Sequence, residues 1–487
     1  MLASFKTLQA AYLPVLITYF AYGASGITSV AALYFQKDAL GITPAEAAAI
    51  AFWVGLPWSM KMVVGVSSDV YPILGSRRKA YLLLGTLCSF GGYAYLASGV
   101  SSKTAYLAAV VLVAVGFMIQ DVVADALSVE VARTDEEIGH IQTLGRISSL
   151  VGTISVGYAS GVLTGVLGPR PVFALAALLP IMVALAALFV RPSEAAPAGV
   201  VPDERAAAAR EAGPLGGGRA HMVLIGGLAY AAFSVALETL SVPFAQEIVL
   251  AVSGTLIVLL LRHIGLSRAV AVSAFVIFLF RAVPNVGQGY SYWAIDHLKF
   301  DPEFLGLLAQ VSSVLSLVGL VLFRKPITRR PVSFTIAWVS VASFILYLPS
   351  IGLFYGANEW LGLSPRAFAF IDTTISAPLG QLAMVPMLVL IARTAPPGAE
   401  ATMFAIMASL MNLALSASEL FTRYLNTAFA VTQESYEGLG RLMITVGILG
   451  LVPLLAVPLL RREEARLAAS SSPAPEAARA QSPSNAL

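Results

Sequence analysis

Apolar runs of about 20 residues recur along almost the whole chain of 487 residues. The sequence is 58% hydrophobic and only 12% charged, with a mean hydropathy of +0.81. A soluble fold of this length cannot bury so much apolar surface, whereas a run of this length is long enough to cross a bilayer as a helix. We therefore predict an all-α polytopic membrane protein.

Polar segments divide the runs into groups. Residues 1–190 contain six runs and 264–464 contain six more. Between them, 191–220 is rich in Ala, Pro, Gly and charge, which is typical of a flexible linker, and 221–263 predicts an inserted two-helix hairpin. The tail 465–487 has few apolar side chains and is expected to be disordered. We predict about 14 spans, or 12 if the hairpin lies on the membrane surface.

Positive charge is distributed unevenly over the expected loops. If the N-terminus is cytoplasmic, clusters such as Arg77-Arg78-Lys79 and Arg461-Arg462 fall on the cytoplasmic side, and the other side keeps single charges. The apolar run from Leu8 to Phe35 is too long for a signal-peptide core and reads as a retained span. We expect a multi-pass protein of the cell (inner) membrane with both termini cytoplasmic.

Other function classes find little support. A net charge of +3 gives no reason to expect nucleic acid, and the single cysteine, Cys88, excludes an internal disulfide. The four histidines lack ligand spacing, so we expect no metal and no cofactor. No phosphate-binding loop and no nucleophile–base arrangement is present, so we do not expect an enzyme. The expected partners are the bilayer, a small-molecule substrate and protons, and we expect a monomer.

An internal repeat supports two related halves. The segment from Asp38 to Pro44 matches the segment from Asp296 to Pro302, and Val131-Ala-Arg133-Thr134 matches Ile391-Ala-Arg393-Thr394. Both matches lie at span ends, at nearly one offset of about 260 residues, as a duplication of six helices would place them. The hairpin is then an insertion between the two halves.

Several motifs resemble one transporter family. The loop after the second run has Gly65-Val-Ser-Ser-Asp69 followed by Gly75-Ser-Arg77-Arg78, a stretched form of a signature of the major facilitator superfamily. The preceding Leu56-Pro57-Trp58 and the stretch Asp121-Val-Val-Ala-Asp125-Ala-Leu resemble the folate–biopterin transporter family of that superfamily, as does Pro396-Pro-Gly398-Ala-Glu400-Ala-Thr402. The resemblance implies a major facilitator fold of two six-helix halves.

The same resemblance implies a secondary transporter that moves a folate or pteridine by alternating access. Two alternatives remain open: a permease of the muropeptide or acetyl-coenzyme-A type, and a non-transporting membrane assembly factor. The chain departs from the family pattern at Arg146, in Ala282-Val-Pro284-Asn-Val-Gly-Gln and in the hairpin, and these departures put the substrate in question.

Asp121 and Asp125 are the candidates for proton coupling. They stand four residues apart, which places them on one face of a helix, and carboxylates persist inside membrane spans mainly beside water or partners. Burial favours the protonated acid and a nearby cation favours the carboxylate, so Arg146 on the next span is a candidate switching partner. The alternatives are a static ion pair or a solvated helix end.

The candidates for substrate binding lie in the second half. Arg281 falls mid-run beside Pro284, which can break the helix, and its planar fork suits an anionic group. The alternative for Arg281 is snorkelling toward the interface, and for the aromatic candidates it is packing. The other candidates are Asn285, Gln288, Tyr292, Trp293, Asp372 and Gln381.

Charged residues at expected cytoplasmic ends are candidates for a gate. Asp69 can face a helix N-terminus of the other half, and the resemblance implies that this helix begins near Gly398 to Thr402. Arg78 can pair with Glu130, and such contacts would latch the cytoplasmic side. The alternative is a charge cluster that only orients the chain. The full set of gate candidates is Asp69, Arg77, Arg78, Glu130, Arg133 and Glu400. Glu419 and Arg423 have i,i+4 spacing and are expected to pair with each other.

Overall fold

The computed structural model describes most of the apolar chain. The residues described are 10–73, 75–132, 134–190, 217–264, 267–328, 330–379, 386–387, 389–391 and 400–471. Among the candidates named above, Arg133 and Gln381 lie outside the described residues, as does the side chain of Glu400. The predicted linker and disordered tail also lie largely outside them.

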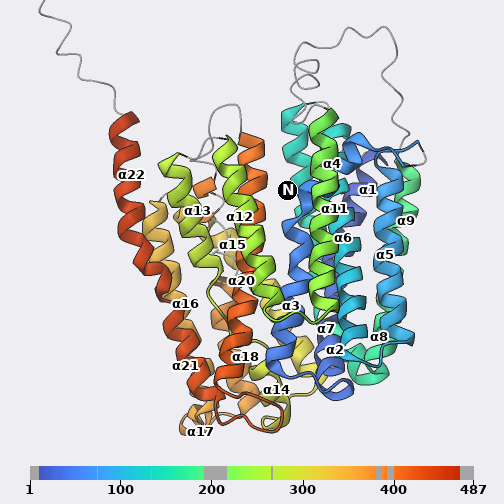
Figure 1. Cartoon of the computed structure of the whole chain (residues 1–487). Coiled ribbons are helices and arrows are strands. Elements are labelled where there is room, and N and C mark those ends of the chain that lie inside the picture. Colours follow the sequence, from blue (N-terminus) through green and yellow to red (C-terminus); the bar gives the residue numbers. More distant parts are fainter. Residues whose placement is uncertain are drawn as a thin grey trace, which may run out of the picture.

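The N-terminal bundle is built from the helices before residue 190 (Figure 1). Its buried apolar side chains form two clusters, one around Phe35, Tyr106 and Phe173 and the other around Tyr81 and Ile141. Its helices are α1 (Leu13–Ala24), α2 (Ser29–Tyr34), α3 (Pro44–Ser59), α4 (Lys61–Val70), α5 (Lys79–Ser98), α6 (Lys103–Val131), α7 (Asp135–Leu167), α8 (Pro169–Ala176) and α9 (Leu178–Ala186).

Local sequence signals set several of these boundaries. At the start of α3, Thr43 and Glu46 form a reciprocal capping box just before Pro44 enters the first turn. At the start of α7, the Thr134 side chain accepts a hydrogen bond from the Glu137 backbone amide. Such caps satisfy backbone N–H groups that have no partner inside the helix.

The C-terminal bundle and the hairpin complete the fold. The bundle buries one cluster around Ile336 and Met407 and another around Tyr292 and Leu442. The hairpin consists of α11 (Gly217–Thr239) and α12 (Ala245–Ile264). The bundle consists of α13 (Arg268–Arg281), α14 (Gln288–Asp296), α15 (Pro302–Thr328), α16 (Val332–Phe354), α17 (Ala357–Trp360), α18 (Pro365–Ser376), α20 (Glu400–Ala428), α21 (Leu439–Leu449) and α22 (Val457–Ser471).

Within the described residues, 11 helical segments are long and apolar enough to cross a membrane. The all-α membrane architecture is therefore confirmed, and the count of 14 stays a prediction. The three other expected spans correspond to the shorter apolar helix Leu224–Thr239, to the interrupted pair α13 and α14, and to α18 with the partly described region that follows it.

The most extensive contacts between the two bundles are those of α3 with α20 and of α7 with α15. In the second pair, a Cβ on Gly161 would lie 2.8 Å from the Cα of Gly306, so the two backbones approach closely because both residues are glycine. These contacts lie toward the molecular end formed by Phe35–Ala39, the 296–301 loop and the 433–437 loop, which we call the sealed end. It lies at the bottom of Figure 1.

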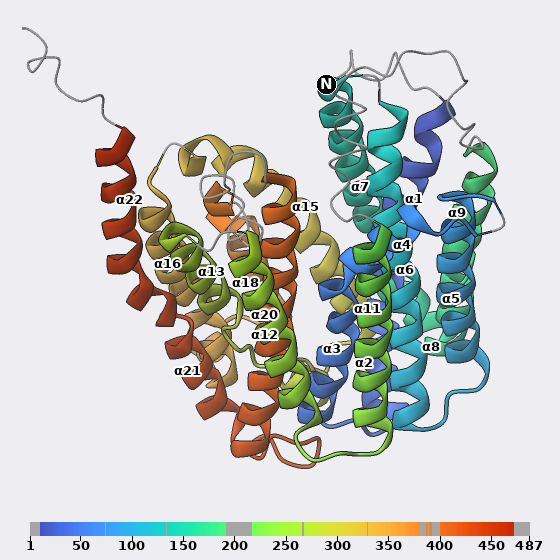
Figure 2. The same cartoon turned by 45° about the horizontal axis from the view of Figure 1, so that its top comes forward.

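The opposite end carries the Arg77-Arg78-Lys79 loop together with Arg268 and Arg461, and we call it the basic end. There the ribbons of the two bundles diverge, as Figure 2 shows. The helices of the two bundles are thus close together at the sealed end and farther apart at the basic end.

The chain between α13 and α14 is not helical, as predicted from Pro284. One face of α20 satisfies the freed backbone groups: Ser418 donates to the carbonyl of Val283 at 2.6 Å, and the Asn285 amide donates to Thr422 Oγ1 at 3.0 Å. Asn426 donates to the carbonyl of Val286 at 3.1 Å. Irregular backbone at membrane depth persists only where protein or water supplies such partners.

Candidate functional site

The first polar cluster lies in the N-terminal bundle, where α1, α4 and α6 meet. Lys61 of α4 forms an ion pair with Asp121, and the Tyr19 hydroxyl of α1 donates to Asp125. Asp121 is buried, with 8% of its surface exposed. The two carboxylates therefore share one face of α6, as predicted, and each has its own partner.

Lys61 is the partner of Asp121 that sequence reasoning missed. The predicted partner, Arg146 on α7, is exposed and forms no ion pair among the described residues, although its charge acts on Asp125. Lys61 also lies over the Trp58 ring, 4.9 Å from its centroid. Lys61 follows shortly after the Leu56-Pro57-Trp58 motif that resembles the family, and its nearness to Asp121 depends on helix packing.

The second polar cluster lies at the break in the C-terminal bundle. The Nε atom of Arg281 is buried and has no hydrogen-bond partner among the described residues. Asn285 donates to Glu419 of α20 at 3.3 Å. Glu419 does not pair with Arg423 in the described structure, because Arg423 instead donates to Gln246 of α12 at 3.0 Å.

The remaining predicted substrate residues are spread more widely. Asp372 on α18 accepts a hydrogen bond from Ser350 of α16 at 2.8 Å, and Gln288, at the start of α14, is half-buried. Tyr292 is fully buried and Trp293 nearly so, both within the apolar cluster near the sealed end. In this arrangement those two rings pack the bundle, and their predicted contact with substrate stays a prediction.

At the basic end, Arg78 connects three polar partners within the N-terminal bundle. It donates to Asp69 at 2.6 Å, to Ser68 at 2.7 Å and to Glu130, whose nearest oxygen lies 2.6 Å away. Burial alone would lower the pKa of Arg78, but the bonds to Glu130 and Asp69 outweigh burial and raise that pKa. The Arg77 side chain is exposed, so Arg78 is the arginine of this pair that forms the network.

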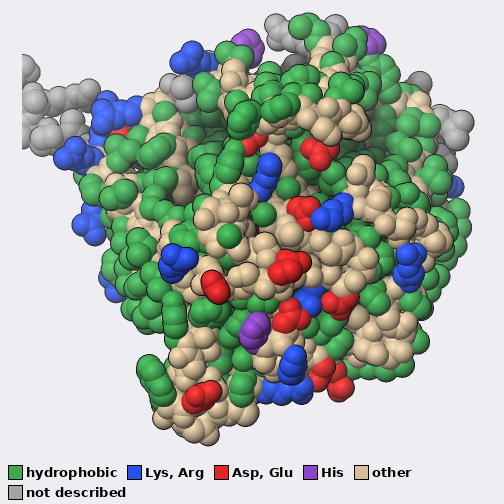
Figure 3. Space-filling view, turned by 60° about the horizontal axis from the view of Figure 1, so that its bottom comes forward, with side chains coloured by type: hydrophobic (Ala, Val, Ile, Leu, Met, Phe, Trp, Pro, Cys, Tyr) green, Lys and Arg blue, Asp and Glu red, His purple; other side chains and the backbone are tan. Residues whose placement is uncertain are grey.

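At the sealed end, polar contacts join the two bundles. Buried Lys37 pairs with Asp296 at 2.6 Å, and Gln433 donates to the carbonyl of Ile42 at 2.9 Å. The Tyr34 hydroxyl donates to the carbonyl of Phe300 at 3.0 Å, and Tyr158 donates to Glu303. Figure 3 looks onto this end, where acidic and basic side chains gather near the middle of the face.

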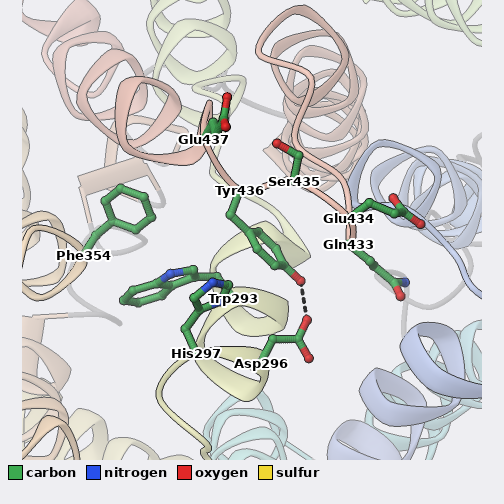
Figure 4. A pocket seen from close by; sticks show the side chains of 9 residues that line it. All are labelled: Trp293, Asp296, His297, Phe354, Gln433, Glu434, Ser435, Tyr436 and Glu437. Carbon is green, nitrogen blue, oxygen red and sulfur yellow. Dashed lines mark hydrogen bonds between the residues drawn. The ribbon is translucent and has the colours of Figure 1, made fainter.

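A cavity of about 410 Å³ opens at the sealed end beside these contacts (Figure 4). The Tyr436 hydroxyl donates to Asp296 at 2.6 Å, while the His297 ring stacks on Trp293 with 6.2 Å between centroids. Burial and the hydrogen bond to Asp296 raise the pKa of Tyr436. Asp296 therefore bridges Lys37 of one bundle and Tyr436 of the other, at the edge of this cavity.

Comparison with known families decides the classification. The model of the BT1 family matches residues 23–474, nearly the whole chain. The chain belongs to the BT1 family. Similar curated proteins include the folate-biopterin transporter of Synechocystis sp., 30% identical over 92% of this chain and 81% of that protein, and folate transporter 2 of Plasmodium falciparum, 23% identical over 95% and 91%.

Solved structures agree on the fold. A transporter of the POT family bound to a thioalcohol-conjugated peptide superposes with a TM-score of 0.66, covering 93% of this chain and 96% of that one at 13% identity. A nucleoside transporter superposes with a TM-score of 0.63, covering 93% of this BT1-family chain and 100% of that chain at 11% identity. The predicted major facilitator fold is confirmed.

Proposed function

We propose that this protein is a secondary transporter of a folate or pteridine, that it works by alternating access, and that the present structure is the state open at the basic end. Curated relatives that match most of the chain are named as folate or folate-biopterin transporters. Contacts between the bundles at the sealed end and their divergence at the basic end support the assignment of state (Figure 2).

The observation that carries the substrate class is Arg281. A guanidinium at membrane depth is costly, and such cations pair with carboxylates or face a water-filled path. In this structure its Nε atom is buried beside a helix break and has no hydrogen-bond partner among the described residues. A carboxylate of the substrate, such as that of the glutamyl group of a folate, supplies the missing charge and a bidentate acceptor.

The cluster of Lys61, Asp121, Asp125 and Tyr19 is our candidate for proton coupling. Asp121 already has a full cationic partner, whereas Asp125 has a neutral phenol. We therefore take Asp125 as the carboxyl that accepts the transported proton, since no ion pair among the described residues holds its charged form. Asp121 and Lys61 are then the fixed pair beside it.

The test is uptake of labelled folic acid and of biopterin by proteoliposomes, with and without an inward proton gradient. We expect gradient-stimulated uptake of at least one compound, and no uptake of a muropeptide. Folded protein that transports neither compound would remove the substrate assignment and leave the fold intact.

Two variants separate binding from coupling. Arg281→Gln should weaken folate uptake at least tenfold, mostly through KM, whereas Arg441→Gln, which changes an exposed arginine of α21, should not. Asp125→Asn should abolish stimulation by the gradient but retain exchange of labelled for unlabelled substrate. Loss of exchange in Asp125→Asn would assign Asp125 to binding instead.

We also propose that the basic end is cytoplasmic, in line with the excess of Arg and Lys there. Cysteines placed at Arg77 and at Glu359, each in a Cys88→Ser background, test this with a membrane-impermeant thiol reagent on intact cells. Position 359 is exposed on α17 near the sealed end, so the cysteine placed there should react on intact cells. The cysteine at position 77 should react only after the cells are lysed.

A further inference from the structure

The inserted hairpin is attached to both bundles. Its first leg, α11, packs on α4 of the N-terminal bundle, and its second leg, α12, packs on α20 of the C-terminal bundle (Figure 1). Near the turn, Gln246 is 3% exposed, donates to the carbonyl of Ala49 on α3 and accepts from Arg423 on α20. The hairpin therefore holds the two bundles together near the sealed end.

Farther from the turn, a cavity of about 220 Å³ lies between the two legs, α4 and α20. Most of the side chains around it are apolar, and none of the described residues that line it is charged. Of its few polar groups, Ser253 and Tyr230 are already hydrogen-bonded to each other. An apolar cavity of about 150 Å³ stays dry and takes up an apolar guest, so water is a poor occupant for this larger one.

The rim of the cavity is continuous with surface that faces the bilayer. Met222 of α11 and Leu256 of α12 line it and are 72% and 45% exposed. Next to them on the outer faces of the legs, Ile225 and Leu259 are 66% and 54% exposed. In a membrane-spanning hairpin, exposed apolar side chains of this kind contact lipid tails.

We propose that this hairpin cavity binds one acyl chain of a membrane lipid. The absence of charge in its lining argues against the anionic substrate as the occupant, and its position at the lipid-facing surface lets a chain enter without crossing water. Packing against Met60, Met62 and Leu260 provides the contacts, since flexible thioether side chains adapt to an irregular guest. The site does not depend on which solute is transported or on proton coupling.

Two glycines of the hairpin provide a matched test. Gly226 lines the cavity, and a Cβ built there meets no atom within 4 Å, so Gly226→Leu fills the space without a clash. Gly254 also has no atom within 4 Å of such a Cβ but is not part of the lining. Both changes add the same side chain to a helix of the hairpin, so Gly254→Leu controls for helix propensity and for added apolar surface.

The probe is a phosphatidylcholine with a photoreactive diazirine on one acyl chain, in nanodiscs that contain the full chain. In the wild-type protein we expect label on peptides of α11 and α12 that contain cavity residues, at a higher yield than on the lipid-exposed helix α9. Gly226→Leu should lower that yield at least fivefold, and Gly254→Leu should leave it unchanged. Label with no enrichment, or equal label in Gly226→Leu, overturns the proposal.

Ser409→Leu, which fills the cavity from α20, gives a second variant if Gly226→Leu does not fold. It should lower the yield in the same way. Addition of folic acid or biopterin distinguishes the occupants: label that either compound displaces would make the cavity a substrate site and overturn the lipid assignment. Label that persists in their presence supports it.

Discussion

The two ends of the molecule use their charges differently. At the sealed end, Lys37 and Asp296 pair across the bundles, and Tyr158 reaches Glu303 in the same way. At the basic end, Arg78 binds two carboxylates, and both belong to its own bundle. One set of contacts therefore holds the bundles together, and the other stabilises a single bundle whatever its neighbour does. Changes at the two ends should have separable effects on conformation and on folding.

The largest effect is expected where the bundles meet backbone to backbone. In Gly161→Leu, the new Cβ would lie only 2.8 Å from the Cα of Gly306, which is closer than van der Waals contact allows. Helices α7 and α15 therefore cannot pack as closely as they do in the wild type. Overpacking of this kind costs roughly 1–3 kcal/mol, or more where backbone has to move. We expect uptake to fall at least tenfold and spin labels at Ser101 and Glu359, on opposite bundles near the sealed end, to move apart.

Gly139→Leu is the matched control on the same helix. Gly139 lies toward the basic end, and a Cβ there meets no atom within 4 Å. It should leave both uptake and the label distance near the wild-type values. Unchanged distance in Gly161→Leu, with the protein folded, would mean that this glycine contact does not hold the sealed end together.

A smaller effect is expected from Asp296→Asn. Among the described residues, the change leaves Lys37, which is 9% exposed, with only the exposed Asp38 as a charged partner, 3.2 Å away. Because Asp296 is itself partly exposed, we expect the sealed end to lose about 1–3 kcal/mol, less than a fully buried pair would cost. Double electron–electron resonance between Ser101 and Glu359 labels should show a second, longer distance.

Glu434→Gln is the comparison for that change, since Glu434 lines the same cavity and forms no ion pair among the described residues. The Glu434→Gln variant should keep a single short distance between the labels at Ser101 and Glu359. Lys37→Met combined with Asp296→Asn completes a double-mutant cycle: if the two effects simply add, the Lys37–Asp296 contact does not stabilise the sealed end.

Arg78→Gln should act on folding and leave the conformational balance unchanged. Its loss frees Asp69 and Glu130, which are exposed enough to be hydrated, so the cost is roughly 1–2 kcal/mol of stability. We expect a lower Tm in detergent with an unchanged distance at the sealed end, whereas Arg77→Gln should change neither. A longer distance in Arg78→Gln would show that the network couples to the other bundle after all.

The sequence predicted what depends on one helix at a time. The apolar runs located the helices, Pro284 marked the break, and the spacing of Asp121 and Asp125 placed both on one face of α6. Arg78 and Glu130 were also paired correctly, because they flank neighbouring helices. These features follow from local geometry and from the bilayer as solvent.

Contacts between distant helices could not be predicted in this way. Lys61 and Asp121 are 60 residues apart, and Lys37 and Asp296 lie in different halves of the repeat. Which of several charges becomes the partner depends on helix rotation and tilt, which packing determines. The burial of Tyr292 depends on packing in the same way: in this structure α14 turns the ring into the apolar core, and its contact with substrate stays a prediction.

The smallest effect expected is a pH dependence of stability that comes from Asp301 at the sealed end, whose partners belong to its own bundle. Burial alone would raise the pKa of Asp301, but the backbone amide of Phe304 and the guanidinium of Arg366 lower it below its ordinary value. A carboxyl whose pKa is lower in the folded protein stabilises it above the unfolded pKa of about 4, and this stabilisation is lost as the pH falls through the folded value. Asp301 and Arg366 are 46% and 49% exposed, so solvent screening limits the contribution to a few tenths of a kcal/mol.

The measurement is the difference in Tm between wild type and Asp301→Asn at pH 7 and at pH 3. The wild type should be slightly more stable at pH 7, and the difference should be smaller at pH 3, because protonation of the Asp301 carboxyl removes the charge that Arg366 and the Phe304 amide stabilise. Glu359→Gln removes an exposed carboxylate of the same bundle and should show no such trend. Because Asp301 and Arg366 belong to one bundle, the distance across the sealed end should stay constant through the titration. A distance that grows as the pH falls would place this pair among the contacts that hold the bundles together.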